Sequence, residues 1–163
     1  MIFGQFTQRL SNTTLWPWLF PITYLLHIAE EYWGGEGYSA YLLSLRGVQL
    51  SPTRFLLVQT IGFALMIIGI ILARRLQFRN LMSVIIGAVV LANGLTHTIL
   101  SIAYTEYVPG LITSIVLWIP LGMATLLGLR RMMRDARYWL SVALGVGING
   151  IIELVTSKVG QVF

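Results

Sequence analysis

The sequence predicts an all-α membrane protein, a helical bundle with five transmembrane helices. Two features of its composition lead to this fold class. Of the 163 residues, 56% are hydrophobic and only 10% are charged, whereas a soluble domain carries about a quarter charged residues. Several apolar runs also reach or approach the length of about 20 residues that a helix needs to cross a bilayer. We therefore expect one membrane-embedded domain that covers residues 1–163.

Five segments are expected to cross the membrane, at about residues 15–33, 54–73, 81–104, 109–129 and 138–157. Pro120 lies inside the fourth segment and predicts a kink there. The longest link, residues 34–52, contains YSAYLLSLRG, which is typical of a short amphipathic helix in the outer interface. This link can be a plain connection or a lid over a site that faces outward, and the plain connection is the more common role of such links.

Arginine-rich links set the expected orientation. They cover residues 74–80 and 130–137, after the second and fourth segments, and together they hold Arg74, Arg75, Arg79, Arg130, Arg131, Arg134 and Arg137. Because positively charged short loops stay in the cytoplasm, we expect the N-terminus inside and the C-terminus outside. The same asymmetry explains the net charge of +5 without nucleic-acid binding. The absence of cysteine excludes disulfides, thiolate catalysis and thiolate–metal sites.

The stretch HIAEEYW, residues 27–33, breaks the apolar character of the first segment. His27, Glu30 and Glu31 stand at positions i, i+3 and i+4 and share one helical stripe. Ionisable side chains inside a bilayer are costly, and they mark functional sites. The sequence therefore predicts a polar site that faces the interior of the bundle.

Two further segments carry polar pairs with helical i, i+4 spacing, Asn93 with His97 and Asn149 with Glu153. The first, third and fifth segments run in the same direction. At 1.5 Å per residue, His27, His97 and Glu153 each lie about 18–24 Å from the inner face, in the outer half of the bilayer. Nearby glycines are expected to let the helix backbones approach closely, namely Gly87, Gly94, Gly145, Gly147 and Gly150.

These motifs in order resemble the HXXEE family of small bacterial membrane proteins. The motif itself is His27-Ile28-Ala29-Glu30-Glu31, followed by Asn93-x-x-x-His97 and a late Glu153. The resemblance covers most of the chain. It implies a protein of the bacterial inner (cytoplasmic) membrane with a functional site, and it implies no particular reaction.

Two histidines and three glutamates match the ligand preferences of Zn²⁺, Fe²⁺ or Mn²⁺. They predict a metal-dependent, hydrolase-like enzyme that acts on a lipid or another apolar substrate from the bilayer. The expected roles are metal ligation by His27, Glu30, His97 and Glu153, catalysis by Glu31 and Glu30, and orientation of the cofactor's ligands by Asn93 and Asn149.

Three alternatives stay open. A metal-free acid–base isomerase could use the same histidines and carboxylates, and the emopamil-binding sterol isomerases resemble this chain in layout. An ion-binding or transport protein fits less well, because the inner half of every segment is apolar. A structural subunit of a membrane complex would not need the polar residues. The sequence also leaves open whether the chain forms a homo-oligomer.

Overall fold

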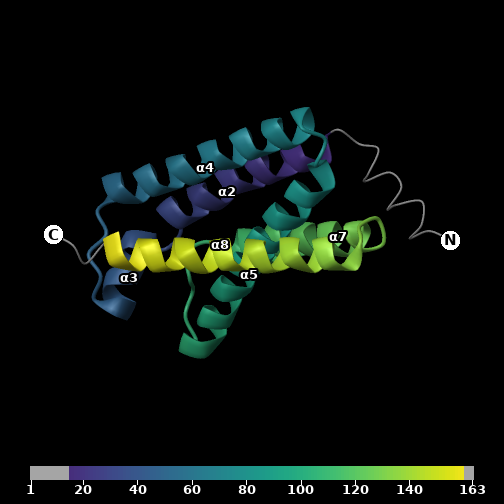
Figure 1. Ribbon diagram of the computed structural model, residues 1–163. Helices are drawn as coiled ribbons and strands as arrows, with labels where there is room; N and C mark the ends of the chain where they lie inside the picture. The colour runs from purple at the N-terminus through teal and green to yellow at the C-terminus, as the bar shows by residue number, and fades with distance from the viewer. Residues whose placement is uncertain (1–14, 160–163) are drawn as a thin grey trace.

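The computed structural model describes residues 15–159, and every regular element in this range is a helix (Figure 1). The all-helical prediction is therefore confirmed. The elements in chain order are η1 (Trp16–Trp18), α2 (Leu19–Trp33), α3 (Tyr38–Arg46), α4 (Pro52–Arg75), α5 (Arg79–Tyr104), α6 (Leu111–Thr113), η2 (Ser114–Trp118), α7 (Ile119–Arg130) and α8 (Asp135–Val159).

Four helical segments of the described chain are long and apolar enough to cross a membrane. They are Pro52–Arg75, Arg79–Tyr104, Leu111–Arg130 and Asp135–Thr156, and they match the second to fifth predicted segments. The first predicted segment is shorter than expected. A 3₁₀ turn at Trp16–Trp18 precedes α2, which has 15 residues and ends where Gly34 turns to an extended conformation. The membrane character is thus supported, and the first predicted segment is not among the four candidate spans.

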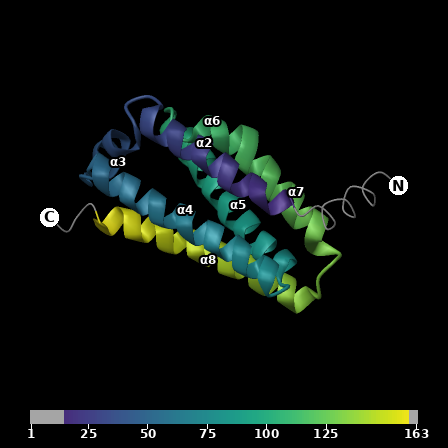
Figure 2. The same cartoon turned by 90° about the horizontal axis from the view of Figure 1, so that it is seen from above.

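Helix α5 is the centre of the bundle. It packs most extensively against α8 and α7, and it also contacts α4. Figure 2 shows α4 and α8 along one side, α6 and α7 along the other, and α5 between them. Helix α2 lies against α4 and α6. One core cluster joins α2, α4, α5 and η2 through Phe20, Ile70, Ile86, Val90 and Trp118.

Three of the five glycines expected at close helix contacts do lie at such contacts. A Cβ at Gly145 of α8 would collide with the backbone of α5, and a Cβ at Gly87 or Gly94 of α5 would crowd side chains of η2 and α7. The prediction is wrong for Gly147 and Gly150, because nothing lies within 4 Å of a Cβ at either position. Small residues therefore let α5 approach both neighbours, while part of α8 faces away from the bundle.

The distortion predicted at Pro120 takes the form of a π-helical turn. The backbone N–H of Ile119 donates to the carbonyl of Ser114, five residues earlier, and Pro120 follows directly. Proline has no N–H to continue the regular ladder, and single π turns occur where a helix absorbs such an interruption. The turn matters for the site because it contains Trp118.

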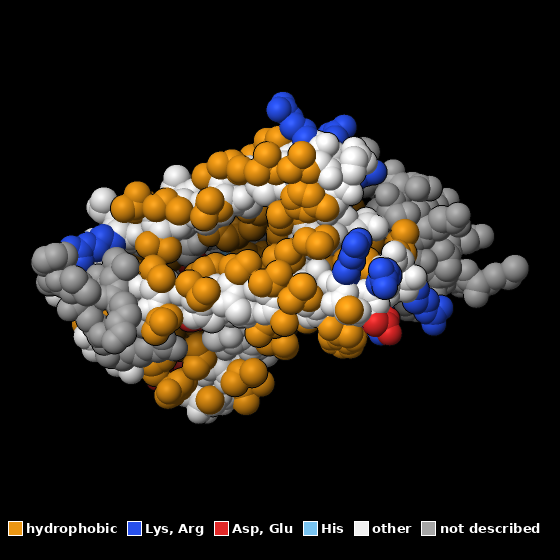
Figure 3. All heavy atoms as spheres, in the orientation of Figure 1, with side chains coloured by type: hydrophobic (Ala, Val, Ile, Leu, Met, Phe, Trp, Pro, Cys, Tyr) orange, Lys and Arg blue, Asp and Glu red, His pale blue; other side chains and the backbone are white. Residues whose placement is uncertain are grey.

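The two arginine-rich links lie side by side at one end of the bundle. Residues of both, including Phe78 and Arg134, line a common cavity of about 360 Å³, and Lys and Arg side chains gather there in Figure 3. The short helix expected in residues 34–52 is present as α3 at the other end (Figure 1). It is held to the start of α4 by a cluster of Leu42, Val48, Leu50 and Phe55.

Candidate metal centre

Three ionisable side chains meet in the interior. His27 and Glu31 lie one turn apart on α2, and His97 comes from α5. The Nε2 atoms of His27 and His97 lie 3.6 and 3.4 Å from the same carboxylate oxygen, Oε1 of Glu31. The exposed fractions of the three residues are 1%, 3% and 4%, in the order His27, His97, Glu31. One ligand atom from each lies within 4.8 Å of the other two, so the group could hold a metal ion.

The spacing of these atoms fits a metal better than a direct hydrogen bond. Ligand atoms about 2.0–2.1 Å from a tetrahedral ion stand about 3.3–3.4 Å apart, close to the measured 3.4 and 3.6 Å. A charge-assisted hydrogen bond between imidazole and carboxylate would be shorter, about 2.7–2.9 Å. Nε2 of His27 has no hydrogen-bond partner in the described chain.

Thr113 fixes the tautomer of His27. The Thr113 hydroxyl lies 2.5 Å from Oε2 of Glu30 and 2.8 Å from Nδ1 of His27. A hydroxyl has one proton to donate, and here it donates to the carboxylate oxygen of Glu30. The same hydroxyl oxygen must then accept the Nδ1–H of His27. In the neutral ring this leaves the lone pair on Nε2, the nitrogen that faces Glu31, which is the arrangement a metal-binding histidine requires.

The second carboxylate oxygen of Glu31, Oε2, is fixed by a hydrogen bond. The Gln59 side-chain amide of α4 donates to Oε2 of Glu31 at 2.7 Å, and the hydroxyl of Tyr24 donates to Oε1 of Gln59 at 2.7 Å. These bonds leave Oε1 of Glu31 pointing between the two imidazoles. Helices α2, α4 and α5 therefore all contribute to the position of this carboxylate, as expected for support around a metal ligand.

Glu30 makes different contacts from those expected of the metal ligand and catalytic residue that the sequence predicts. Its carboxylate accepts four hydrogen bonds, from the Tyr107 hydroxyl (2.7 Å), the backbone N–H groups of Ile112 (2.8 Å) and Thr113 (2.6 Å), and the Thr113 hydroxyl. The two N–H groups belong to the first turn of the Leu111–Arg130 helix, whose N-cap residue, Gly110, has no side chain. Glu30 thus caps this helix from α2, and both of its oxygens are engaged by these donors.

The loop before α6 closes over the group. Gly110 has φ +92°, and a Cβ there would lie 2.8 Å from Cε1 of His27 and 3.0 Å from Cε1 of His97. Only glycine suits this backbone conformation and this close approach. In the same loop, burial and the hydrogen bond to Glu30 raise the pKa of Tyr107 to about 12. The phenol therefore stays protonated and keeps donating to Glu30.

Aromatic rings pack around the two histidines. The indole of Trp118 stacks on the imidazole of His27, with ring centroids 3.6 Å apart, and His27 meets His97 edge-on at 5.0 Å. The ring of Tyr38 on α3 lies 6.2 Å from that of His97. These contacts place aromatic rings against both imidazoles. Nδ1 of His97 is buried without a hydrogen-bond partner among the described residues.

The other predicted site residues lie outside the group. Glu153 is on α8, which packs against α5 and α4, and the three-residue group of the described chain does not include it. No hydrogen bond joins Asn93 or Asn149 to the two histidines, and the side-chain carbonyls of both are buried without a partner in the described chain. The structure therefore brings together His27 and His97, adds Glu31, and leaves Glu153 apart.

Sequence reasoning missed the residues that position the group: Tyr24, Gln59, Tyr107, Gly110, Thr113 and Trp118. A partial signal existed for two of them. Gln59 is an isolated amide within an apolar run, and PGLIT at residues 109–113 places a glycine before a helix start. Neither signal states which carboxylate the residue will meet.

The chain matches the model of a known family. A family model described as "Protein of unknown function with HXXEE motif" matches residues 18–125. This range includes His27, Glu31 and His97 and the residues that support them, and it ends before Asn149 and Glu153. No curated protein and no solved structure matches the chain significantly.

Proposed function

The chain belongs to the HXXEE family, whose function is unknown, and from the geometry of its buried group we propose that it is a membrane metalloenzyme. The ligands would be Nε2 of His27, Nε2 of His97 and Oε1 of Glu31. The ion would be a divalent transition metal, Zn²⁺ or alternatively Fe²⁺ or Mn²⁺, because two imidazoles and one carboxylate suit all three.

One observation carries this proposal. Three buried ligand atoms from two helices converge with separations of 3.4 and 3.6 Å, and two of the three ligands are oriented by further hydrogen bonds. A metal-free acid–base pair would share a proton at hydrogen-bond distance. The observed gap is wider, which favours an ion between the three groups over the isomerase alternative.

The proposed reaction is hydrolase-like. Three protein ligands leave a fourth coordination position open, and a metal in such a site would supply an activated water or polarise a substrate carbonyl or phosphoryl oxygen. The substrate would be a lipid or another apolar molecule, because the group lies among helices whose outer surfaces are apolar. Glu30 would act as a positioning residue rather than as a ligand or a catalytic base, since all its accepting positions are engaged.

We also propose a single domain with five membrane crossings, in which η1 and α2 form a short first crossing. The bundle would sit in the cytoplasmic membrane of a bacterium, with the N-terminus inside and the C-terminus outside. The grouping of both arginine-rich links at one end supports this orientation. A C-terminal reporter enzyme that works only outside the cytoplasm should be active, and a cytoplasm-specific reporter at the same point should be silent.

Elemental analysis tests the metal directly. Full-length protein, purified in mild detergent without chelators, should contain close to one equivalent of zinc, iron or manganese. The His97→Ala variant should lose it. Asn93→Ala is the matched control, since it removes a polar side chain one turn away on the same helix and should keep the metal. A metal-free wild-type protein that also fails to take up added Zn²⁺ would overturn the proposal and favour acid–base chemistry.

A further inference from the structure

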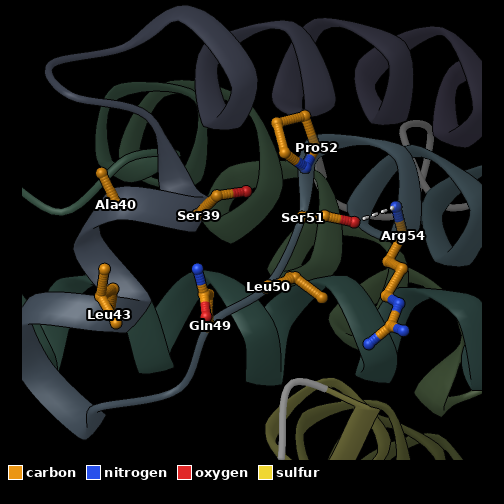
Figure 4. A pocket seen from close by; sticks show the side chains of 8 residues that line it. All are labelled: Ser39, Ala40, Leu43, Gln49, Leu50, Ser51, Pro52 and Arg54. Atoms are coloured by element: carbon orange, nitrogen blue, oxygen red, sulfur yellow. Dashed lines mark hydrogen bonds between the residues drawn. The ribbon is translucent and has the colours of Figure 1, made fainter. Parts of the chain in front are cut away.

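A second cavity lies at the opposite end of the bundle from the arginine-rich links. Its volume is about 550 Å³, within the range of about 300–1,000 Å³ typical of small-molecule sites. Figure 4 shows its lining residues on α3, on the loop that follows, and on the first turn of α4. These include Ser39, Leu43, Gln49, Leu50 and Arg54.

The lining has two kinds of chemistry. The hydroxyl groups of Ser39 and Ser51, the amide of Gln49 and the guanidinium of Arg54 can all donate hydrogen bonds. None of the described lining residues is acidic, so nothing in the wall repels an anion. Leucine, alanine and proline side chains make up the rest. A ligand that is anionic at one end and apolar at the other would match this wall.

The position of the cavity indicates that such a ligand is a membrane lipid. Arg54 belongs to the first turn of α4, and the apolar, exposed surface of that helix continues from there. Leu57, Ile61 and Leu65 have exposed fractions of 59%, 51% and 64%, and hydrophobic side chains run along α4 in Figure 3. A headgroup at Arg54 would leave its acyl chains on this surface.

We propose that the cavity binds the phosphate headgroup of an anionic membrane lipid. The guanidinium of Arg54 would pair with the phosphate oxygens, the pairing for which its geometry is best suited. Ser39 and Gln49 would donate further hydrogen bonds, and Leu43 and Leu50 would contact the glycerol and the first methylene groups.

The cavity is separate from the metal-binding group but shares α3 with it. Ser39 and Leu43 line the cavity, while Tyr38 on the same helix faces His97. A lipid bound in the cavity would therefore contact the same short helix that places a ring beside His97. The proposal does not depend on a metal, because its ligand contacts none of the three metal-binding residues.

Native mass spectrometry tests lipid binding. The full-length protein in detergent is titrated with dioleoyl phosphatidylglycerol. We expect one saturable lipid adduct, whose affinity falls about fivefold or more in Arg54→Gln, because a charge-assisted contact is lost. Arg74→Gln, at the other end of the same helix, should bind as the wild type does. Ser39→Phe, which fills the cavity from α3, should also weaken binding.

Two results would overturn the proposal. One is equal lipid binding by the wild type, Arg54→Gln and Ser39→Phe. The other is displacement of the lipid by glycerol 3-phosphate at equal concentration, which would indicate a soluble phosphate compound as the ligand. Metal content measured on the same samples keeps this test distinct from that of the metal centre.

Discussion

The hydroxyl oxygen of Thr113 lies 2.8 Å from Nδ1 of His27 and, through its proton, bonds to the carboxylate of Glu30. These contacts link a helix cap to an imidazole of the candidate metal centre. Glu30 and His27 belong to the same helix, so one turn of α2 both anchors the Leu111–Arg130 helix and presents the ligand. The two glutamates of the HXXEE motif therefore make different contacts: Glu31 lies beside both histidines of the candidate metal centre, and Glu30 caps the start of the Leu111–Arg130 helix.

Thr113→Val should weaken metal binding. The variant keeps the shape of the side chain but removes the acceptor for Nδ1–H of His27. We expect the affinity to fall about 10- to 100-fold, the usual cost of losing such a partner, as measured by competition with a chromophoric chelator. Thr98→Val is the control, because the Thr98 hydroxyl bonds only to its own helix, at Gly94. Equal affinities of the two variants would show that Thr113 has no part in ligand positioning.

Substitution of the two glutamates of the motif should have different effects, one on metal content and the other on stability. Glu31→Gln should lose the metal with little change in folding. Glu30→Gln should keep the metal but lower the free energy of unfolding by about 1–3 kcal/mol, because its amide N–H₂ would face N–H donors. Metal content and SDS-induced unfolding in mixed micelles measure the two effects. Loss of metal from Glu30→Gln with retention in Glu31→Gln would reverse the assignment.

Gly110→Ala should disturb both the fold and the metal-binding group. The positive φ costs about 1–3 kcal/mol for a non-glycine residue, and the added Cβ would press on the two imidazoles. Gly47→Ala separates the two effects, since Gly47 has φ +63° but nothing within 4 Å of its Cβ position. Both variants should be less stable, and only Gly110→Ala should lose metal affinity, by about tenfold. A similar loss in Gly47→Ala would mean that general destabilisation is the cause.

Tyr107 gives the stability of the fold a dependence on alkaline pH. Its pKa is about 12 in the folded protein against an ordinary value of 10, so the folded state binds the phenolic proton more tightly than the unfolded chain. Its contribution is complete below pH 10 and is lost as the pH rises from 10 towards 12. The difference in unfolding temperature between the wild type and Tyr107→Phe should be constant up to pH 10 and then shrink. A difference that grows above pH 10 would contradict this account.

The contact between α5 and α8 can be tested at two glycines. Gly145→Ala should destabilise the bundle by about 1–3 kcal/mol, because its Cβ would overlap the α5 backbone. Gly150→Ala has open space around its Cβ and should be neutral, or stabilising by up to about 1 kcal/mol through helix propensity. Unfolding in mixed micelles measures both, and equal effects would show that α8 does not approach α5 at Gly145.

The sequence predicted the helical class, four of its five expected segments match candidate membrane helices, and the two histidines it singled out do come together in the candidate metal centre. Periodicity and distance along the helices were sufficient for this. Counting residues gives the height of a side chain in the membrane, but not the side of the helix that it faces within the bundle. For this reason His97 and Glu153 looked equivalent, although α8 packs mainly on α5 and Glu153 lies outside the group of His27, Glu31 and His97 in the described chain.

The division of work between Glu30 and Glu31 could not be predicted for a related reason. Adjacent helical residues point about 100° apart, and the stripe alone does not say which one faces the second histidine. Which glutamate faces the histidines depends on where the loop before α6 packs against α2. The position of this loop depends on the left-handed turn at Gly110 and the helix start at Leu111, and neither follows from hydrophobic periodicity.

X-ray absorption spectroscopy at the edge of the bound metal tests the central claim most directly. The full-length protein is measured with the metal that co-purifies or, if none does, after reconstitution with Zn²⁺. The account predicts a first shell of nitrogen and oxygen at about 2.0–2.1 Å, with the outer-shell scattering of two imidazoles, reduced to one imidazole in His97→Ala. A spectrum without imidazole scattering, or one that His97→Ala leaves unchanged, would contradict it.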